Sequence, residues 1–278
     1  MDNKPLTLAY SPCPNDTYIF AALTNGLLKD VPEVRVALED IENLNNSAMQ
    51  GDYELTKVSY GAVPDLYDKY RVLRAGGALG HGCGPLLVAR PGTGKTLEDF
   101  KDKIIAIPGE RTTAFMLLNL AMGARPQTLS MRFDKIIESV ASGTADAGLI
   151  IHESRFTYKE SDLVSIADLG EWWEAETQLP VPLGAILIRE DLAERAPELN
   201  EAIRRSLGYA RENEKDVMKY VREHADEMDE TIMRKHIELY VNEFTDEVGD
   251  EGIAAVSELF KRARAQKIIP EAAEARFV

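Results

Sequence analysis

The stretch Leu6-Thr-Leu-Ala-Tyr10-Ser-Pro-Cys-Pro-Asn-Asp-Thr-Tyr-Ile-Phe20 joins an apolar strand pattern, a loop stiffened by two prolines and the start of a helix. Asn15, Asp16 and Thr17 are residue types that cap helix N-termini, and capping is the role we expect for Asp16 taken alone. A strand that leads directly into a helix presents backbone N–H groups at the helix start, and such groups bind anions. The stretch therefore predicts a β–α unit with a pocket for a small anion at its turn.

Strand-like and helix-like segments continue to alternate through the first two thirds of the chain, which is typical of parallel sheets covered by helices. The predicted strands are Leu6–Tyr10, Val34–Leu38, Leu55–Ser59, Arg71–Leu73, Ile104–Ile107, Leu129–Phe133 and Ala147–Ile151. The predicted helices are Tyr18–Leu28, Leu44–Gln50, Thr113–Met122 and Lys135–Ala141. After Arg189, amphipathic helices are predicted over Asp191–His224 and Glu230–Lys267, with breaks at Pro197, near Ala225–Asp229 and at Gly249.

Two apolar segments, Gly84–Arg90 and Pro182–Arg189, are placed to cross between two α/β units. This organisation predicts an α/β, two-lobed fold of the periplasmic-binding-protein type II kind, with two crossing strands and C-terminal helices. The larger lobe is expected to hold residues 1–88 and 189–278, and the smaller lobe residues 89–188. Because ligands of open α/β sheets bind at the carboxyl ends of the strands, we expect the site between the lobes.

The composition is that of an ordinary globular protein, with 45% hydrophobic and 28% charged residues. The net charge of −15 argues against nucleic acid and anionic membrane surfaces as partners, because their binding needs a basic face. No basic segment followed by an apolar run opens the sequence, and no apolar run has the length of a membrane span. We therefore expect a cytoplasmic protein, and the sequence assigns no oligomeric state.

The two cysteines, Cys13 and Cys83, both lie beside glycine or proline in expected loops, and a cytosolic protein keeps such thiols reduced. The chain has no Cys-x-x-Cys pair, no His-x-x-x-His pair and no run of carboxylates and histidines. The sequence therefore predicts no metal site.

Two predicted strand ends, at Ser59–Tyr60 and at Ile151–His152, are candidate functional positions. Shifting the chain by 92 residues aligns Gly51–Tyr60 with Gly143–His152, so Ser59 and Tyr60 correspond to Ile151 and His152. Two such units would place these strand ends on facing walls of one cleft, although a chance match of common β–α patterns remains the alternative. An imidazole there, with an ordinary pKa of about 6.5, is mostly neutral at pH 7 and is available as a base. By strand alternation, Glu153 is expected to point away from His152.

Other segments agree with a single family. Together with Thr56-Lys-Val-Ser-Tyr60, Gly80-His-Gly-Cys-Gly-Pro85, Arg111-Thr-Thr-Ala114 and Gly148-Leu-Ile-Ile-His-Glu153, the opening stretch resembles the 1,4-dihydroxy-6-naphthoate synthases of the futalosine route to menaquinone. The resemblance implies the same fold and the conversion of cyclic dehypoxanthine futalosine to 1,4-dihydroxy-6-naphthoate, a lyase reaction without metal or redox cofactor. It implies that His152 is the base that abstracts a proton.

The resemblance also implies substrate contacts from the segments around Ser59 and Thr112. The Thr112-Thr113 pair precedes an apolar helix and is suited both to capping that helix and to holding a carboxylate, whereas Lys57 is equally explained as a solvated strand residue. With the loop of the opening stretch, the candidate residues for binding a small carboxylated substrate are Ser11, Asn15, Asp16, Lys57, Val58, Ser59, Thr112, Thr113 and Ala114.

Two alternative functions share this fold. One is a non-catalytic receptor for a carboxylate, against which the missing export signal argues. The other is chorismate dehydratase, an enzyme of the same pathway. The Ser11–Thr17 string and His152 favour the naphthoate synthase over the dehydratase.

Overall fold

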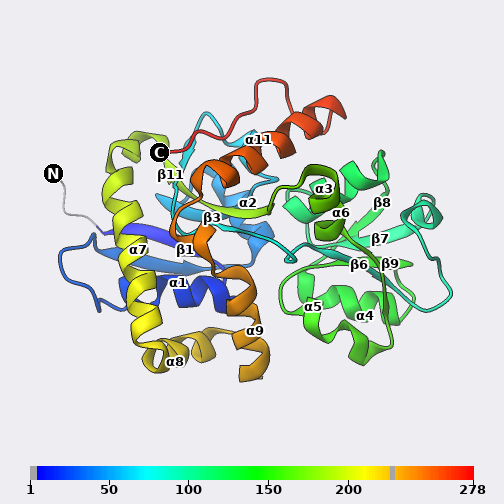
Figure 1. Ribbon diagram of the computed structural model, residues 1–278, viewed down its shortest axis with the longest axis horizontal. Coiled ribbons are helices and arrows are strands. Elements are labelled where there is room, and N and C mark those ends of the chain that lie inside the picture. The colour runs from blue at the N-terminus through cyan, green and yellow to red at the C-terminus, as the bar shows by residue number, and fades with distance from the viewer. Residues whose placement is uncertain (1–4, 226–228) are drawn as a thin grey trace.

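The computed structural model describes residues 5–225 and 229–278 and forms two lobes, each built around a β-sheet (Figure 1). The first sheet has the strand order β2-β1-β3-β11-β4, and β5 also pairs with β11. Its strands are β1 (Leu6–Tyr10), β2 (Val34–Leu38), β3 (Leu55–Ser59), β4 (Tyr70–Val72), β5 (Ala78–Gly80) and β11 (Val181–Arg189). Strands β2, β1 and β3 are parallel, whereas β11 runs antiparallel to β3, β4 and β5.

The second sheet has the order β10-β6-β9-β7-β8. Its strands are β6 (Leu86–Ala89), β7 (Ile104–Ile107), β8 (Gln127–Ser130), β9 (Ala147–Ile150) and β10 (Val164–Asp168). The chain enters this sheet through β6 and returns to the first sheet through β11, so the two predicted crossing segments are strands in the structure. The lobe division at residues 88 and 189 stays a prediction. Strand β11 pairs within the first sheet from Val181 onwards.

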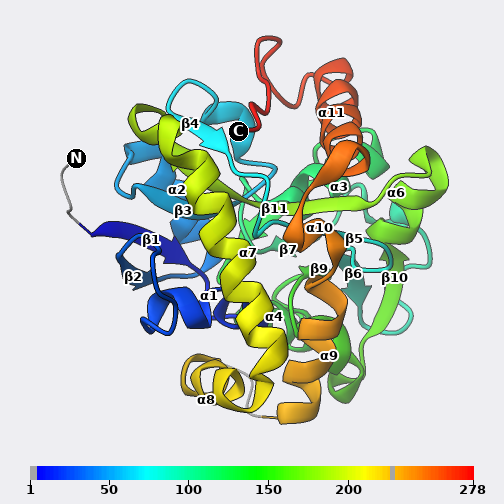
Figure 2. The same ribbon diagram turned by 60° about the vertical axis from the view of Figure 1, so that its left-hand side comes forward.

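Helices cover both sheets, and the C-terminal helices pack around the first lobe (Figures 1 and 2). The helices of the first two thirds are α1 (Pro14–Thr24), α2 (Ile41–Gln50), α3 (Thr113–Met122), α4 (Ile136–Ala141), α5 (Ser154–Thr157) and α6 (Leu169–Thr177). Those of the last third are α7 (Ala196–Glu212), α8 (Glu214–His224), α9 (Glu230–Tyr240), α10 (Glu243–Asp246) and α11 (Gly249–Ala265). Helix α1 packs against α7, α8 and α9, and α11 packs on β11 and reaches α3 of the second lobe.

Several boundaries differ from the prediction for local reasons. Helix α1 begins at Pro14, four residues before the predicted start, because a proline at the first helical position needs no N–H acceptor and has a helical φ. Pro197 likewise lies in the first turn of α7 and does not break it. The helix instead ends at Asn213, which separates α7 from α8. The predicted break near Ala225–Asp229 lies partly outside the described residues.

The hydrophobic core runs through both lobes. One buried cluster includes Leu187 of β11, Leu87 of β6 and Phe115 of α3, and a second cluster joins the β1 face of the first sheet to α1 and α7. Within residues 5–225 and 229–278, no helix has both the length and the apolar character that a bilayer crossing demands.

At Gly84, in the segment before β6, the backbone lies against the backbone at the start of α6. A Cβ atom added to Gly84 would lie 2.2 Å from the Gly170 nitrogen, at the start of α6. We expect Gly84→Ala to lower the free energy of unfolding by about 1–3 kcal/mol, because backbone must shift to admit the methyl group. Chemical denaturation measures this change.

The matched control is Gly208→Ala in α7, where nothing lies within 4 Å of the added Cβ. This variant should gain about 0.5–1 kcal/mol, since alanine restricts the unfolded chain more than glycine does. Equal stability of the Gly84→Ala variant and the unchanged protein would contradict the close packing described here.

Candidate active site

A cavity of about 80 Å³ lies where the ends of β1, β3 and β9 meet the start of α3 and the side of α9. Its walls therefore come from both sheets, as expected for ligand sites at the carboxyl ends of strands. The polar residues that line it are Ser11, Asn15, Asp16, Lys57, Ser59, Thr112, Thr113, His152, His236 and Tyr240. Nearly all residues predicted for the site, with Ala114 among them, are thus brought together from distant parts of the chain.

Strand β3 explains which of its residues face the cavity. Side chains alternate along a strand, so Lys57 and Ser59 share one face and Val58 takes the other. Val58 is fully buried in the hydrophobic core and does not line the cavity. Ser59 is held in place by Asn45 of α2, which accepts a hydrogen bond from the Ser59 backbone N–H at 2.9 Å and donates its amide to the Ser59 hydroxyl at 3.3 Å. Tyr60 is buried and also lies outside the lining residues.

Asp16 and Lys57 form a buried ion pair at the cavity wall. The Lys57 ammonium lies 2.6 Å from a carboxylate oxygen of Asp16, and the two side chains are 5% and 2% exposed. Asp16 also accepts hydrogen bonds from the Ser11 hydroxyl at 2.8 Å and the Asn15 amide at 2.9 Å. The expectation that Asp16 is an ordinary helix cap is therefore wrong: the N-cap residue is Cys13, and the Asp16 carboxylate binds side chains of the site. Lys57 is likewise not a solvated strand residue.

The start of α3 provides a second polar wall. Thr112 is the N-cap and accepts a hydrogen bond from the Phe115 N–H at 3.2 Å, as predicted. Thr113 donates its hydroxyl to the Leu183 carbonyl at 2.7 Å and accepts from the Gly61 N–H at 3.0 Å. The Thr113 hydroxyl proton is thus used to join the lobes. The backbone N–H groups of Thr113 and Ala114, in the first turn of α3, have no acceptor inside the helix, and groups of this kind are suited to bind an anion.

His152 follows β9 and lies at the cavity with an unusual backbone. Its φ is 57°, in the left-handed region that few residues other than glycine adopt, and such strain is concentrated at functional sites. Its Nδ1 atom lies 3.5 Å from the Cys13 sulfur, and its ring packs edge-on against Phe133 with centroids 4.9 Å apart. Burial lowers the pKa of His152 to about 4, so the expectation of an ordinary value is wrong and the ring is neutral over a wider pH range.

Glu153 and His236 complete the surroundings of His152. Because β9 ends at Ile150 and His152 is left-handed, strand alternation does not apply, and Glu153 lies near His152. One Glu153 carboxylate oxygen is 3.7 Å from Nδ1 of His236 in α9, whose ring centroid lies 6.1 Å from that of His152. His236 is only 1% exposed, and burial holds its pKa well below the ordinary value.

His236 lies in α9, a helix rich in charged residues, and yet it is buried. Of the eleven residues in α9, Met233, His236 and Tyr240 are buried, a spacing of three and four that marks one face of the helix. That spacing was the available signal. It identifies the buried face, but it does not reveal that the face lies against His152.

Two sheets joined by crossing strands, with a cavity at the strand ends, define a periplasmic-binding-protein-like fold. The structure is similar to that of the alkanesulfonate-binding protein SsuA of Xanthomonas axonopodis pv. citri, with a TM-score of 0.74 over 97% of this chain and 95% of that one. The two sequences are 14% identical, so this likeness concerns the fold alone.

Closer relatives identify the family. A family model described as "Menaquinone biosynthesis" matches residues 6–265. Proteins named "1,4-dihydroxy-6-naphtoate synthase" from Thermus thermophilus and Streptomyces coelicolor are 47% and 41% identical to this chain, over 99% and 97% of its length and 100% and 96% of theirs. A crystal structure of an Archaeoglobus fulgidus protein is 36% identical, with a TM-score of 0.89 over 95% of this chain and 98% of that one. The chain belongs to this menaquinone biosynthesis family.

Proposed function

We propose that this chain is a 1,4-dihydroxy-6-naphthoate synthase that converts cyclic dehypoxanthine futalosine to 1,4-dihydroxy-6-naphthoate and releases the sugar remnant. The reaction is a lyase reaction, and its place is the cytoplasm. The observation that carries the proposal is the imidazole of His152 at a cavity lined by residues of both lobes. A relative of that name, 47% identical over 99% of this chain, supports the product, and the resemblance to the family supplies the substrate.

His152 is the general base of the proposed reaction. Its Nδ1 faces the Cys13 sulfur, which leaves Nε2 as the nitrogen that takes a proton from the substrate. The electron pair of the broken C–H bond then drives elimination of the sugar remnant, and the new aromatic ring supplies the driving force. A positioned base of this kind contributes about 10²–10⁴ to the rate.

The substrate carboxylate is assigned to the start of α3, where the N–H groups of Thr113 and Ala114 point outward from the helix end. Another part of the cavity wall, at β3, carries the Lys57 ammonium, whose charge is balanced by the Asp16 carboxylate. The cavity of about 80 Å³ is smaller than the roughly 300–1,000 Å³ of ligand pockets, so the lobes must separate to admit the substrate. Separation breaks the Thr113 hydrogen bonds to Gly61 and Leu183, and their return closes the site around the ligand.

The test is incubation of the purified protein with cyclic dehypoxanthine futalosine, followed by absorbance and mass measurement of the product. Formation of 1,4-dihydroxy-6-naphthoate at enzymatic rates is the expected result. Bound but unchanged ligand would identify a receptor instead. Conversion of chorismate in a parallel incubation would identify a chorismate dehydratase, and either outcome would overturn the proposal.

The lowered pKa of His152 predicts an acid-resistant enzyme. The base works unprotonated, so kcat/KM should stay high below pH 6.5 and fall only as the pH drops through about 4. The free energy of unfolding should also fall as the pH is lowered. The unfolded chain binds a proton at this histidine near pH 6.5 and the folded chain only near pH 4, so the contribution of His152 to stability is lost between about pH 6.5 and 4. Rates are measured with circular dichroism at each pH, and loss of kcat/KM around pH 6.5 in folded protein would contradict the assignment.

A further inference from the structure

Three side chains of types that bind metals, those of Cys13, His152 and Glu153, meet beside the cavity. Cys13 is distant from the other two in the sequence, and strand alternation predicted that His152 and Glu153 point apart. One donor atom from each of Cys13, His152 and Glu153 lies within 4.8 Å of the other two. Cys13 comes from the loop after β1, and the other two follow β9, so the lobes bring the group together. Within the described parts of the chain, neither cysteine is in a disulfide.

The spacing of the two softest donors fits a bound zinc ion. Bond lengths of about 2.3 Å for Zn–S and about 2.0–2.1 Å for Zn–N, at a tetrahedral angle, place sulfur and nitrogen about 3.6 Å apart. The Cys13 sulfur and His152 Nδ1 are 3.5 Å apart. A thiolate, an imidazole and a carboxylate form the mixed donor set that suits zinc and excludes magnesium and calcium, which prefer oxygen alone.

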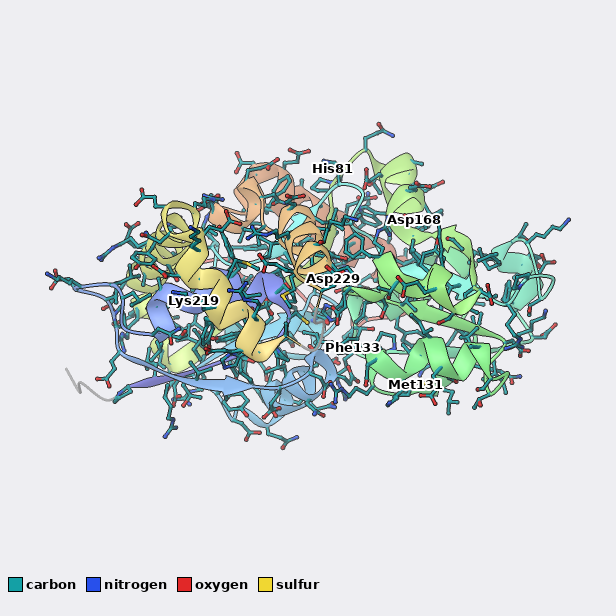
Figure 3. All side chains as sticks on the ribbon, turned by 90° about the horizontal axis from the view of Figure 1, so that it is seen from below. His81, Met131, Phe133, Asp168, Lys219 and Asp229 are labelled. Carbon is teal, nitrogen blue, oxygen red and sulfur yellow. The ribbon has the colours of Figure 1, made fainter. Side chains whose placement is uncertain are left out.

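Charge and access are also favourable. Ionised Cys13 and Glu153 would together balance a divalent cation, while His152 enters the site as a neutral ligand. His236, which lies across from His152 and near Glu153, is a buried imidazole close enough to orient the carboxylate as an outer partner. A second cavity, of about 650 Å³, is lined by Glu153, Ser154 and Phe133, so one of the three donor residues borders it. Figure 3 shows Phe133 near the border between the lobes.

We propose that Cys13, His152 and Glu153 form a binding site for a zinc ion, and that zinc at this site inhibits the enzyme by occupying the base. The ion would bind the Nδ1 lone pair of neutral His152, which leaves the ring proton on Nε2, so that Nε2 could no longer accept a proton from the substrate. Zinc binding is independent of the proposed function. Its inhibitory effect rests on that function, because it requires His152 to be the base.

The first experiment measures binding alone. Chelator-treated, full-length protein is titrated with Zn²⁺ by calorimetry and with Co²⁺ by absorbance, because cobalt bound to a thiolate gives a charge-transfer band in the near ultraviolet. The expected result is one ion per chain and a thiolate–cobalt band. Absence of that band in the unchanged protein would overturn the proposal without any variant.

Cys13→Ser and Cys83→Ser are the matched pair of variants. Both cysteines are buried, but Cys83 lies outside the donor group, and burial raises its pKa to about 12, which opposes thiolate formation. Cys13→Ser should lose the cobalt band and bind Zn²⁺ at least about 100-fold more weakly, since even outer-shell changes cost about 10–100-fold. Cys83→Ser should keep both. Equal binding by Cys13→Ser and the unchanged protein would overturn the site.

The second experiment measures inhibition. Formation of 1,4-dihydroxy-6-naphthoate should fall in proportion to zinc occupancy and return when the ion is removed with EDTA. If the protein binds zinc at full occupancy and the rate is unchanged, the inhibitory role is wrong. If the metal-free protein forms no naphthoate, the proposed function fails, and the zinc site is still judged by the binding experiment.

Discussion

Replacing His152 by alanine is expected to lower the turnover of cyclic dehypoxanthine futalosine by about 10²–10⁴, because the substrate loses its positioned base. The fold and measurable substrate binding should remain, since the proposed site for the carboxylate is the start of α3 and not the imidazole. Product formation gives kcat, and calorimetry with the unreacted substrate gives the affinity. An affinity that persists while kcat collapses separates loss of chemistry from loss of the site.

Two further variants make this result interpretable. His152→Asn keeps a residue that tolerates the left-handed backbone, so its loss of turnover cannot be attributed to backbone change. His81→Ala removes an exposed histidine that pairs with Glu174 away from the cavity, and it should leave turnover unchanged. Near-normal turnover by His152→Asn would refute the role of His152 and direct attention to His236.

Lys57→Met is expected to destabilise the protein by about 3–5 kcal/mol. The substitution keeps the length of the side chain and removes the ammonium that pairs with Asp16. A buried carboxylate is then left without its counter-charge. Chemical denaturation gives the free energy of unfolding. Turnover should fall as well, because the two residues form part of the cavity wall.

Lys219→Met is the control, since Lys219 pairs with Asp216 on the exposed surface of α8 and is visible in Figure 3. Such pairs contribute about 0–1 kcal/mol. The double variant Lys57→Met/Asp16→Asn removes both buried charges and should regain most of the lost stability, although not the turnover. A loss for Lys57→Met as small as that for Lys219→Met would contradict the buried pair.

The strands and helices of the first two thirds follow from local patterns. Five strands or helices, such as β1 and α3, begin and end where the alternation of apolar residues predicts. Errors in the predicted helix boundaries arise where one residue type is compatible with two local structures. Pro14 both stiffens a loop and starts a helix, and Pro197 both breaks and starts helices, so the sequence predicts the element but not which side of the proline it occupies.

The candidate site was predictable to the extent that strand ends meet at one edge of a sheet. Ser59 is the last residue of β3, Thr112 precedes α3 and His152 follows β9, and these ends converge by topology. Contacts between distant elements were not predictable. The pairing of Asp16 with Lys57 and the approach of His236 to His152 depend on how α1, β3 and α9 pack, and no local pattern encodes this. The same long-range packing alters the pKa of His152.

The order in which the chain is synthesised has a consequence for the first lobe. The strands of the second sheet come from one continuous segment, residues 86–168, whereas the first sheet receives β11 only after that segment is complete. At the outer edge of β4, Val72 donates its N–H to the Arg276 carbonyl and accepts from Val278, the last residue. A nascent chain can therefore finish the inserted sheet before β11 has been made, whereas the sheet that contains Lys57 stays incomplete until β11 and residues 276–278 have been added.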